Sequence, residues 1–433
     1  MPARRAAPFR AGAARAGAAG GSLALASSAS IGGALHGYAQ EDSLIKATKH
    51  KPLATTITGS LPRPSWYVAG LAGRRFSTAM ADLVFREQYT DTLAVHITDQ
   101  VRAGLDILTD GDARFDMDVG GRSWFGYLAE RMEGMADPGL RPQPWTSPRE
   151  REAGDILHEV MEARLPFFVR GPVGRGGLEY ARVWKAAQRM TSRPMKLGTC
   201  CGQLLEAVLL NQHYADRREL LFALADSLNQ ELHEVADAGC PIVQLEEPML
   251  HYVAGQDKGA ELTAELYVDA FNREVAGLRD KTEVWVHTCW GNPAAQRVEV
   301  ATSGYEGALG LLDRLDVDVI TFEAASDGGA ALPAIGGAIG KDKKVCIGVV
   351  HHRSLEVETP EQVAALVRKA LRFIEPERLI LSSDCGFGRQ GMSRMHAFHK
   401  MVSLVRGANI VRRELGLEPS PCLAAEQRYS MLA

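Results

Sequence analysis

The sequence predicts an α/β protein with a (β/α)8 fold, the TIM barrel. Short apolar strand candidates alternate with longer segments of helical spacing, and this repeat calls for a parallel sheet with right-handed crossovers. Eight repeats over roughly 350 residues favour a closed barrel over the alternative, an open doubly wound sheet. The candidates are Leu53 to Thr58, Leu105 to Thr109, Met195 to Thr199, Ile242 to Leu245, Glu283 to Val286, Val317 to Phe322, Lys344 to Val350 and Arg378 to Leu381.

Two of the connecting segments carry helix signals. Between Leu220 and Ala238 the apolar residues recur at helical spacing and form one stripe. The segment from Thr359 to Ile374 opens with Thr-Pro-Glu, which is a helix start signal. Both segments are therefore expected to be barrel helices.

Residues 1–50 differ in composition from the rest of the chain. They contain Arg4, Arg5, Arg10 and Arg15 and no acidic residue before Glu41. This pattern is typical of a transit peptide, a twin-Arg export signal or a non-native upstream start. Because the Ala, Gly and Ser residues offer little apolar surface to bury, we expect a disordered or targeting tail. Residues 51–433 are expected to form a single catalytic barrel domain.

The connection between the second and third strand candidates is unusually long. We expect residues 112–190 to form an insertion with its own secondary structure, which acts as a lid over the substrate. Its glycine-rich stretch, residues 171–177, contains Gly174-x-Gly176 but lacks the flanking strand and helix expected of a phosphate-binding loop. The sequence thus does not predict a nucleotide site there.

Composition restricts the classes of partner. The net charge is −4 and no basic face is evident, which argues against nucleic acid or an anionic membrane surface and favours small molecules. No apolar run reaches the roughly 18 residues that span a membrane. Seven cysteines in 433 residues do not resemble a disulfide framework, so we expect a reducing, cytoplasmic compartment. The oligomeric state is not predicted.

Polar residues follow nearly every strand candidate. In a barrel the carboxyl ends of the strands converge on one rim, where the chemistry takes place. The residues at these ends are Thr58-Gly59-Ser60, Asp110-Gly111-Asp112, Glu246-Glu247, His287, Cys289, Glu323, His351-His352-Arg353 and Asp384-Cys385.

Among these residues, His287, Cys289, Cys385 and Glu323 are candidates for a zinc site. His287 and Cys289 share one face of a strand because side chains alternate, and imidazole and thiolate are ligands that zinc prefers. An anionic ligand shell makes zinc a poor activator of water but a good holder of a nucleophilic thiolate. The expected reaction is attack of sulfur on an electrophilic carbon. Taken alone, Cys385 is equally well explained as a small buried residue.

Five motifs follow one another along the chain: Thr56-Ile57-Thr58-Gly59-Ser60-Leu61-Pro62-Arg63, Gln244-Leu245-Glu246-Glu247-Pro248, His287-Thr288-Cys289, Phe322-Glu323 and Asp384-Cys385-Gly386. In this order they resemble the catalytic carboxy-terminal barrel of the cobalamin-independent methionine synthase family. The resemblance covers residues 51 to about 415 and points to the short, single-barrel branch, which also includes enzymes that add coenzyme M to epoxides. It implies a 5-methyltetrahydropteroyltriglutamate-homocysteine S-methyltransferase-like enzyme, which passes a methyl group to zinc-bound homocysteine.

The resemblance also assigns roles to residues. His287, Cys289, Glu323 and Cys385 would hold Zn²⁺, with Glu323 giving way to the thiol. The backbone of Thr58, Gly59 and Ser60 would meet the amino acid. Asp112 stands where the family has Glu, and Glu246 where it has Asp. With Glu247, these carboxylates would bind the ammonium group of the substrate.

Two departures leave the methyl donor open. After the third strand the chain has Cys200-Cys201-Gly202-Gln203 and no Trp before Trp285, so stacking on a folate is unsupported. The two cysteines are interpreted as small buried residues rather than a redox switch. Arg353 stands where the family has an acid/base His, and because Arg does not titrate near neutrality, His351 or His352 is the candidate proton carrier.

Three functions therefore remain in view. The first is methyl transfer to homocysteine, which gives methionine. The second is alkylation of another thiol or from another donor, as in an epoxyalkane:coenzyme M transferase or an enzyme that uses a methylcorrinoid. The third is a non-catalytic zinc or thiol-binding protein, which an acidic rim around the metal ligands disfavours.

Overall fold

A computed structural model describes residues 47–114, 123–136, 167–254, 261–290, 304–388 and 392–426. The chain divides into two compact units, residues 1–43 and 44–433, and the second contains the fold described below. The predicted tail lies outside the described residues except at its end, residues 47–50.

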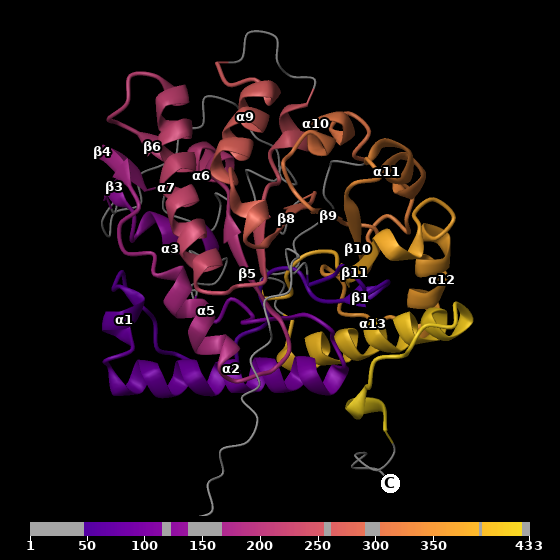
Figure 1. The fold of residues 1–433 in the computed structure, drawn as a ribbon. Coiled ribbons are helices and arrows are strands. Elements are labelled where there is room, and N and C mark those ends of the chain that lie inside the picture. Colours follow the sequence, from indigo (N-terminus) through magenta and orange to yellow (C-terminus); the bar gives the residue numbers. More distant parts are fainter. Residues whose placement is uncertain are drawn as a thin grey trace, which may run out of the picture. The chain divides into compact units, whose positions relative to one another are not determined.

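Eight parallel strands form the centre of the fold (Figure 1). Each of the predicted strands is present, with bounds that differ by a few residues. A buried apolar run shows that a strand exists but defines its ends less well. The strands are β1 (Ala54–Thr55), β2 (Leu108–Thr109), β5 (Met195–Cys200), β7 (Ile242–Glu246), β8 (Glu283–Thr288), β9 (Val319–Phe322), β10 (Lys344–Val350) and β11 (Leu379–Ser383).

The sheet curls so that its two edge strands meet. Its order is β1-β11-β10-β9-β8-β7-β5-β2. From β2 to β11, strands that are neighbours in this sheet also follow one another in the chain, and β1 pairs with β11. The backbone N–H groups of Asp106 and Ile107, just before β2, both donate to the Thr55 carbonyl of β1 at 3.0 Å. A doubly wound sheet would reverse its strand order at a switch point, and this order has no reversal. The fold is therefore TIM-barrel-like.

Helices cover the outside of the sheet (Figure 1). Both predicted helices are present: α7 buries the expected stripe, and α12 begins with a capping box in which Thr359 and Gln362 bond each other's backbone N–H. The helices are α1 (Phe76–Ala79), α2 (Leu83–Ala103), α3 (Ser123–Ala129), α5 (Tyr180–Gln188), α6 (Gly202–Val208), α7 (Arg217–Asp237), α8 (Leu250–Val253), α9 (Ala264–Glu274), α10 (Leu309–Asp313), α11 (Leu332–Ala338), α12 (Pro360–Ala370) and α13 (Arg394–Glu414).

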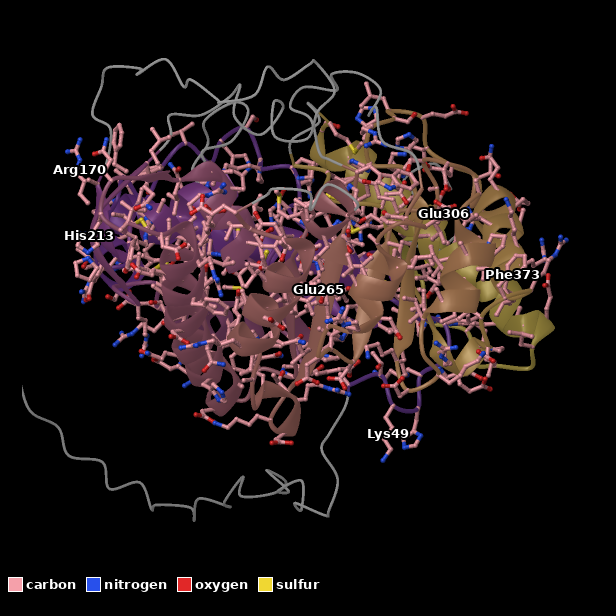
Figure 2. All side chains as sticks on the ribbon, turned by 90° about the horizontal axis from the view of Figure 1, so that it is seen from above. Lys49, Arg170, His213, Glu265, Glu306 and Phe373 are labelled. Carbon is pink, nitrogen blue, oxygen red and sulfur yellow. The ribbon has the colours of Figure 1, made fainter. Side chains whose placement is uncertain are left out.

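A second, three-stranded sheet is built largely from the predicted insertion. Its strands are β3 (Glu133–Ala136), β4 (Phe168–Gly174) and β6 (Leu210–Asn211), in the order β3-β4-β6. Figure 2 shows Arg170 of β4 beside His213 on one flank, opposite Phe373. Residues 115–122 and 137–166 lie outside the described residues, so the lid role stays a prediction.

The prediction that Gly174-x-Gly176 lacks a flanking strand and helix was wrong. Strand β4 ends at Gly174, and α5 begins at Tyr180. The N-terminus of α5 is nevertheless already occupied by a carboxylate: the Tyr180 N–H donates to Glu231 Oε1 at 2.6 Å. A phosphate would have to compete with this bond.

The folded region starts before the predicted boundary at residue 51. Thr48 is buried and donates from both its N–H and its hydroxyl to the carboxylate of Glu283, at the amino end of β8. Among the described residues, no helix is both long enough and apolar enough to cross a membrane.

Candidate metal centre and acidic rim

His287, Cys289 and Cys385 come together at the carboxyl ends of β8 and β11. Their candidate ligand atoms all lie within 4.8 Å of one another, and all three residues are buried. Strand alternation explains the first pair, since His287 and Cys289 are two residues apart at the end of β8. Cys385 follows β11 by two residues. Three of the four predicted zinc ligands are thus placed side by side.

The chemistry of this group fits a metal ion. Both ring nitrogens of His287 are buried. The ring interacts with the Cys385 thiol, and its Nε2 lies 3.7 Å from the Glu246 carboxylate. A metal ion would bind one nitrogen, and two sulfurs with one imidazole are a donor set that zinc accepts.

The three residues also shift each other's pKa values. A hydrogen bond with Cys289 lowers the pKa of the Cys385 thiol well below its usual range, despite the opposing effect of burial, and the charge of His287 lowers it further. Burial would lower the pKa of His287, but the negative charges of Glu246 and Cys385 raise it to about 9. Zinc binds cysteine in its thiolate form, so the interactions that lower the pKa of Cys385 also favour metal binding.

Glu323, the fourth predicted ligand, does not join this group. Its Oε1 accepts from the Trp290 N–H at 3.0 Å, and its Oε2 accepts from Ser326 Oγ at 2.8 Å and Arg353 Nη2 at 3.3 Å. Burial raises its pKa to about 8, although Arg353 opposes the rise. Its role as a ligand stays a prediction.

Asp384 links the loops that carry Cys385 and Glu323. Its Oδ1 accepts from the N–H groups of Ala324 and Ala325 at 2.9 Å, and its Oδ2 from that of Ser326 at 2.8 Å. The loops after β9 and β11 are thereby fixed relative to each other. The sequence placed Asp384 at a strand end but gave no sign of this use.

The predicted substrate-binding turn lies against the loop of Cys385. The Ser60 carbonyl accepts from the N–H groups of Phe387 at 2.8 Å and Gly388 at 3.0 Å. Gly59 has a φ of +68°, and a Cβ there would stand 2.9 Å from the backbone of Gly386. Thr58 is held by a hydrogen bond between its hydroxyl and that of Ser382. The turn therefore needs glycine to approach the metal centre closely.

Glu246 of the predicted rim lies beside the metal centre, and Asp112 is close enough to Glu246 for their charges to interact. Glu246 is the register partner of His287 on the neighbouring strand, and its Oε2 lies 3.7 Å from His287 Nε2. Asp112 has a pKa raised to about 7, mainly by burial and further by Asp110 and Glu246, although Arg114 opposes the rise. Two neighbouring acids that resist ionising together favour binding of a cation.

Arg114 holds Asp112 in place. This fully buried guanidinium donates to Asp112 at 3.0 Å, to Asp110 at 3.1 Å and to the Gly198 carbonyl at 2.6 Å. It lies 5.4 Å from the ring centres of both Tyr127 and Tyr180. In the sequence, Arg114 is only a single Arg two positions after Asp112, and this spacing does not predict its contacts.

The carboxylate of Glu247 is bound by backbone. It is fully buried and accepts from the N–H groups of Met249 and Leu250, the residues at the start of α8. The N–H of Glu247 donates to the His287 carbonyl at 2.8 Å. Its contact with the substrate stays a prediction.

The predicted proton carriers differ in their surroundings. His352 is fully buried, and its charge contributes to the lowered pKa of Cys385. His351 has a pKa lowered to about 4 by burial and by Arg353, and its Nδ1 accepts from the Arg353 N–H. With Asp384, the two histidines form a second group of close ligand atoms. Arg353 itself is paired with Glu323.

The vicinal cysteines fit the interpretation as small buried residues. Cys200 and Cys201 are both buried, and burial raises the pKa of the Cys201 thiol well above its usual value, with Glu247 adding to the rise. None of the seven cysteines forms a disulfide.

Comparisons with known proteins agree on one family. Residues 152–407, more than half of the chain, match the family model described as "Cobalamin-independent synthase, Catalytic domain". The methionine synthase of Saccharolobus solfataricus is 28% identical over 363 residues, which cover 84% of this chain and 96% of that protein. The methionine synthase of Sulfurisphaera tokodaii is 25% identical, with 84% and 94% covered.

Two solved structures share the fold. A B12-independent methionine synthase from a Shewanella species, in complex with selenomethionine, matches with a TM-score of 0.64 and 24% identity, covering 84% of this chain and 99% of that one. A putative vitamin-B12 independent methionine synthase from Listeria monocytogenes matches with a TM-score of 0.57 and 17% identity, covering 82% and 96%.

Proposed function

Because the chain belongs to the cobalamin-independent synthase catalytic-domain family, a family of methyltransferases, we propose that it transfers a methyl group to the sulfur of homocysteine and forms methionine. The observation that carries this proposal is the buried group of His287, Cys289 and Cys385, which lies beside the carboxylate of Glu246. A thiol-binding metal and a cation-binding rim together match an amino acid that carries a thiol.

We propose that zinc is held by His287, Cys289 and Cys385, with Glu323 as a further ligand. When bound, zinc supplies a substrate thiolate at neutral pH, where a free thiol is mostly protonated. The protein's own residues have separate tasks. Glu246 and Asp112 bind and orient the ammonium group, and the backbone at Gly59 and Ser60 lines the remaining side of the amino acid. His352, whose charge interacts with Cys385, is proposed to carry a proton.

The methyl donor stays open between a methylfolate and a methylcorrinoid. Trp285 and Trp290 are the tryptophans nearest in sequence to the metal ligands, and both are buried, Trp290 being stacked on Tyr305 with ring centres 4.9 Å apart. Because both rings are buried, they give no support to stacking on a pterin.

The alternative function is alkylation of an anionic thiol such as coenzyme M, and the charges at the site speak against it. Coenzyme M carries a sulfonate, which carboxylates repel and an Arg would anchor. Arg353, which follows β10, would be such an anchor, but its guanidinium is paired with Glu323. We also propose a cytoplasmic location, because none of the seven cysteines forms a disulfide and a reducing compartment keeps cysteines reduced.

The test is a substrate matrix on the zinc-loaded protein. Homocysteine and coenzyme M are each offered methylfolate, methylcobalamin and epoxypropane. We expect turnover with homocysteine and one of the methyl donors. Preference for coenzyme M with any donor would overturn the assignment of the thiol.

A further inference from the structure

One position inside the barrel departs from the apolar pattern of its neighbours. Seven strands, or the residues next to them, contribute an apolar residue to a cluster that fills the barrel interior: Ala54, Ile107, Ile242, Trp285, Val319, Cys346 and Ile380. β5 contributes Lys196, which pairs in register with Ile242 and is only 2% exposed. Burying an ammonium group is costly unless it is well partnered, so this lysine calls for an explanation.

The partners of Lys196 lead from the barrel interior to the metal centre. Its Nζ donates to Gln244 Oε1 at 2.6 Å and lies 4.7 Å from the ring centre of Trp285. Gln244, also buried, donates from Nε2 to Glu246 Oε1 at 2.7 Å. The other oxygen of Glu246 lies 3.7 Å from His287 Nε2. Three side chains in line thus connect a core lysine to a carboxylate of the rim.

The chemistry of the donors gives this chain a direction. An ammonium group can only donate, so the amide oxygen of Gln244 has to face Lys196. The amide NH₂ then has to face Glu246, which accepts. Both neighbours thus favour the same orientation of the amide, and without the lysine the buried amide oxygen would lose this donor. Lys196 therefore anchors one end of Gln244, and Gln244 anchors Glu246.

We infer that Lys196 is a positioning residue for the substrate's amino group, because through Gln244 it fixes the carboxylate of Glu246 at the mouth of the barrel. The inference rests on the proposed function for the identity of the substrate. It gives the two rim carboxylates matching supports: Arg114 holds Asp112 directly at 3.0 Å, and Lys196 holds Glu246 through one amide. Two acids that repel each other need such supports to stay aimed at one cation.

The test uses Lys196→Met, which keeps most of the side-chain volume and removes the donor. Zinc-loaded wild type and variant are assayed with homocysteine and with 4-sulfanylbutanoate, the same thiol acid without the amino group. We expect the KM for homocysteine to rise roughly tenfold or more with little change in kcat, since one hydrogen bond to a charged group is lost. The KM for 4-sulfanylbutanoate and the zinc content should stay at the wild-type values. A purely structural lysine would affect both thiols alike.

Lys344→Met is the matched control. Lys344 also belongs to a barrel strand, but its Nζ donates to the Thr48 carbonyl, at the opposite end from the metal centre. This variant should leave the ratio of the two KM values unchanged. If Lys196→Met does not fold, Gln244→Met removes the same link while keeping the lysine, and the same selective loss is expected.

Two results would overturn the inference: an equal loss with both thiols, or no change with either. A crystal structure of Lys196→Met gives a readout that does not depend on the substrate, because an unmoved Glu246 would contradict the positioning role. A wild type that does not prefer homocysteine over 4-sulfanylbutanoate would instead contradict the proposed function, and the position of Glu246 would still decide the inference.

Discussion

Asp112 and Glu246 carry the substrate assignment at the scale of single residues. Asp112 is held by Arg114, which keeps a second carboxylate partner in Asp110. Replacing Asp112 by Asn therefore removes one charge from the rim without leaving the guanidinium unpaired. Because Asp112 is not among the three close metal ligands, the metal centre should remain.

For Asp112→Asn we predict a KM for homocysteine that rises by roughly ten- to a hundredfold, since a bound ammonium loses a charged partner. Steady-state kinetics and metal analysis measure the two effects separately. Asp226→Asn is the control, because Asp226 forms an exposed ion pair with Arg273 and should have little effect. Unchanged homocysteine kinetics in Asp112→Asn would remove this residue from the site.

At the same scale, the sequence identified most of the polar side chains at the strand ends but not how they are held. His287 and Cys289 were predictable because alternation along one strand is local. The buried partners were not, since Arg114, Lys196 and Asp384 act through contacts with residues from other strands and loops. Lys196 is recognisable in the sequence as a single Lys within an apolar strand. The sequence does not show that it contacts Gln244, which lies on the neighbouring strand.

At the scale of elements, the loop after β11 depends on a glycine in β10. A Cβ on Gly348 would stand 2.0 Å from Asp384 Oδ1 and 2.4 Å from its Cα. The clash involves backbone, so a side-chain rotation does not relieve it. Asp384 in turn fixes the loop after β9 through three N–H groups.

We predict that Gly348→Ala lowers the free energy of unfolding by about 1–3 kcal/mol, the usual cost of overpacking, and weakens metal binding because Cys385 follows Asp384. Thermal unfolding and zinc titration measure the two effects. Gly337→Ala in α11 is the control, because a Cβ there meets nothing within 4 Å. Wild-type zinc affinity in Gly348→Ala would show that the loop tolerates the shift.

Among the elements, the barrel strands were predictable from the sequence and the second sheet was not. The eight barrel strands were found because each is a buried apolar run bounded by polar residues. The β3-β4-β6 sheet was not, because it joins two strands of the insertion to a short strand that follows β5. A pairing between segments so far apart in the chain leaves no periodic signal.

At the scale of the whole molecule, the position of Thr48 decides where the fold begins. Glu283 is fully buried and accepts from Thr48 and from Trp285 Nε1. A chain that starts at residue 51 would leave this carboxylate without its Thr48 partner. The predicted domain boundary is therefore a few residues too late.

We predict that deleting residues 1–43 leaves thermal stability and activity unchanged, whereas deleting residues 1–50 lowers the free energy of unfolding by about 1–3 kcal/mol, the cost of an unsatisfied buried group. Thr48→Val in the full chain should reproduce part of this loss. If the shorter deletion abolishes activity in a protein that remains folded, the tail belongs to the site.

The central claim is a metal centre built by His287, Cys289 and Cys385, and metal analysis of purified Cys289→Ser and Cys385→Ser proteins tests it most directly. The wild type should hold about one zinc ion per chain. Both variants should lose zinc while their circular dichroism shows a retained fold, because each side chain lies at the barrel mouth outside the apolar cluster of the interior. Stoichiometric zinc in both variants would contradict the account.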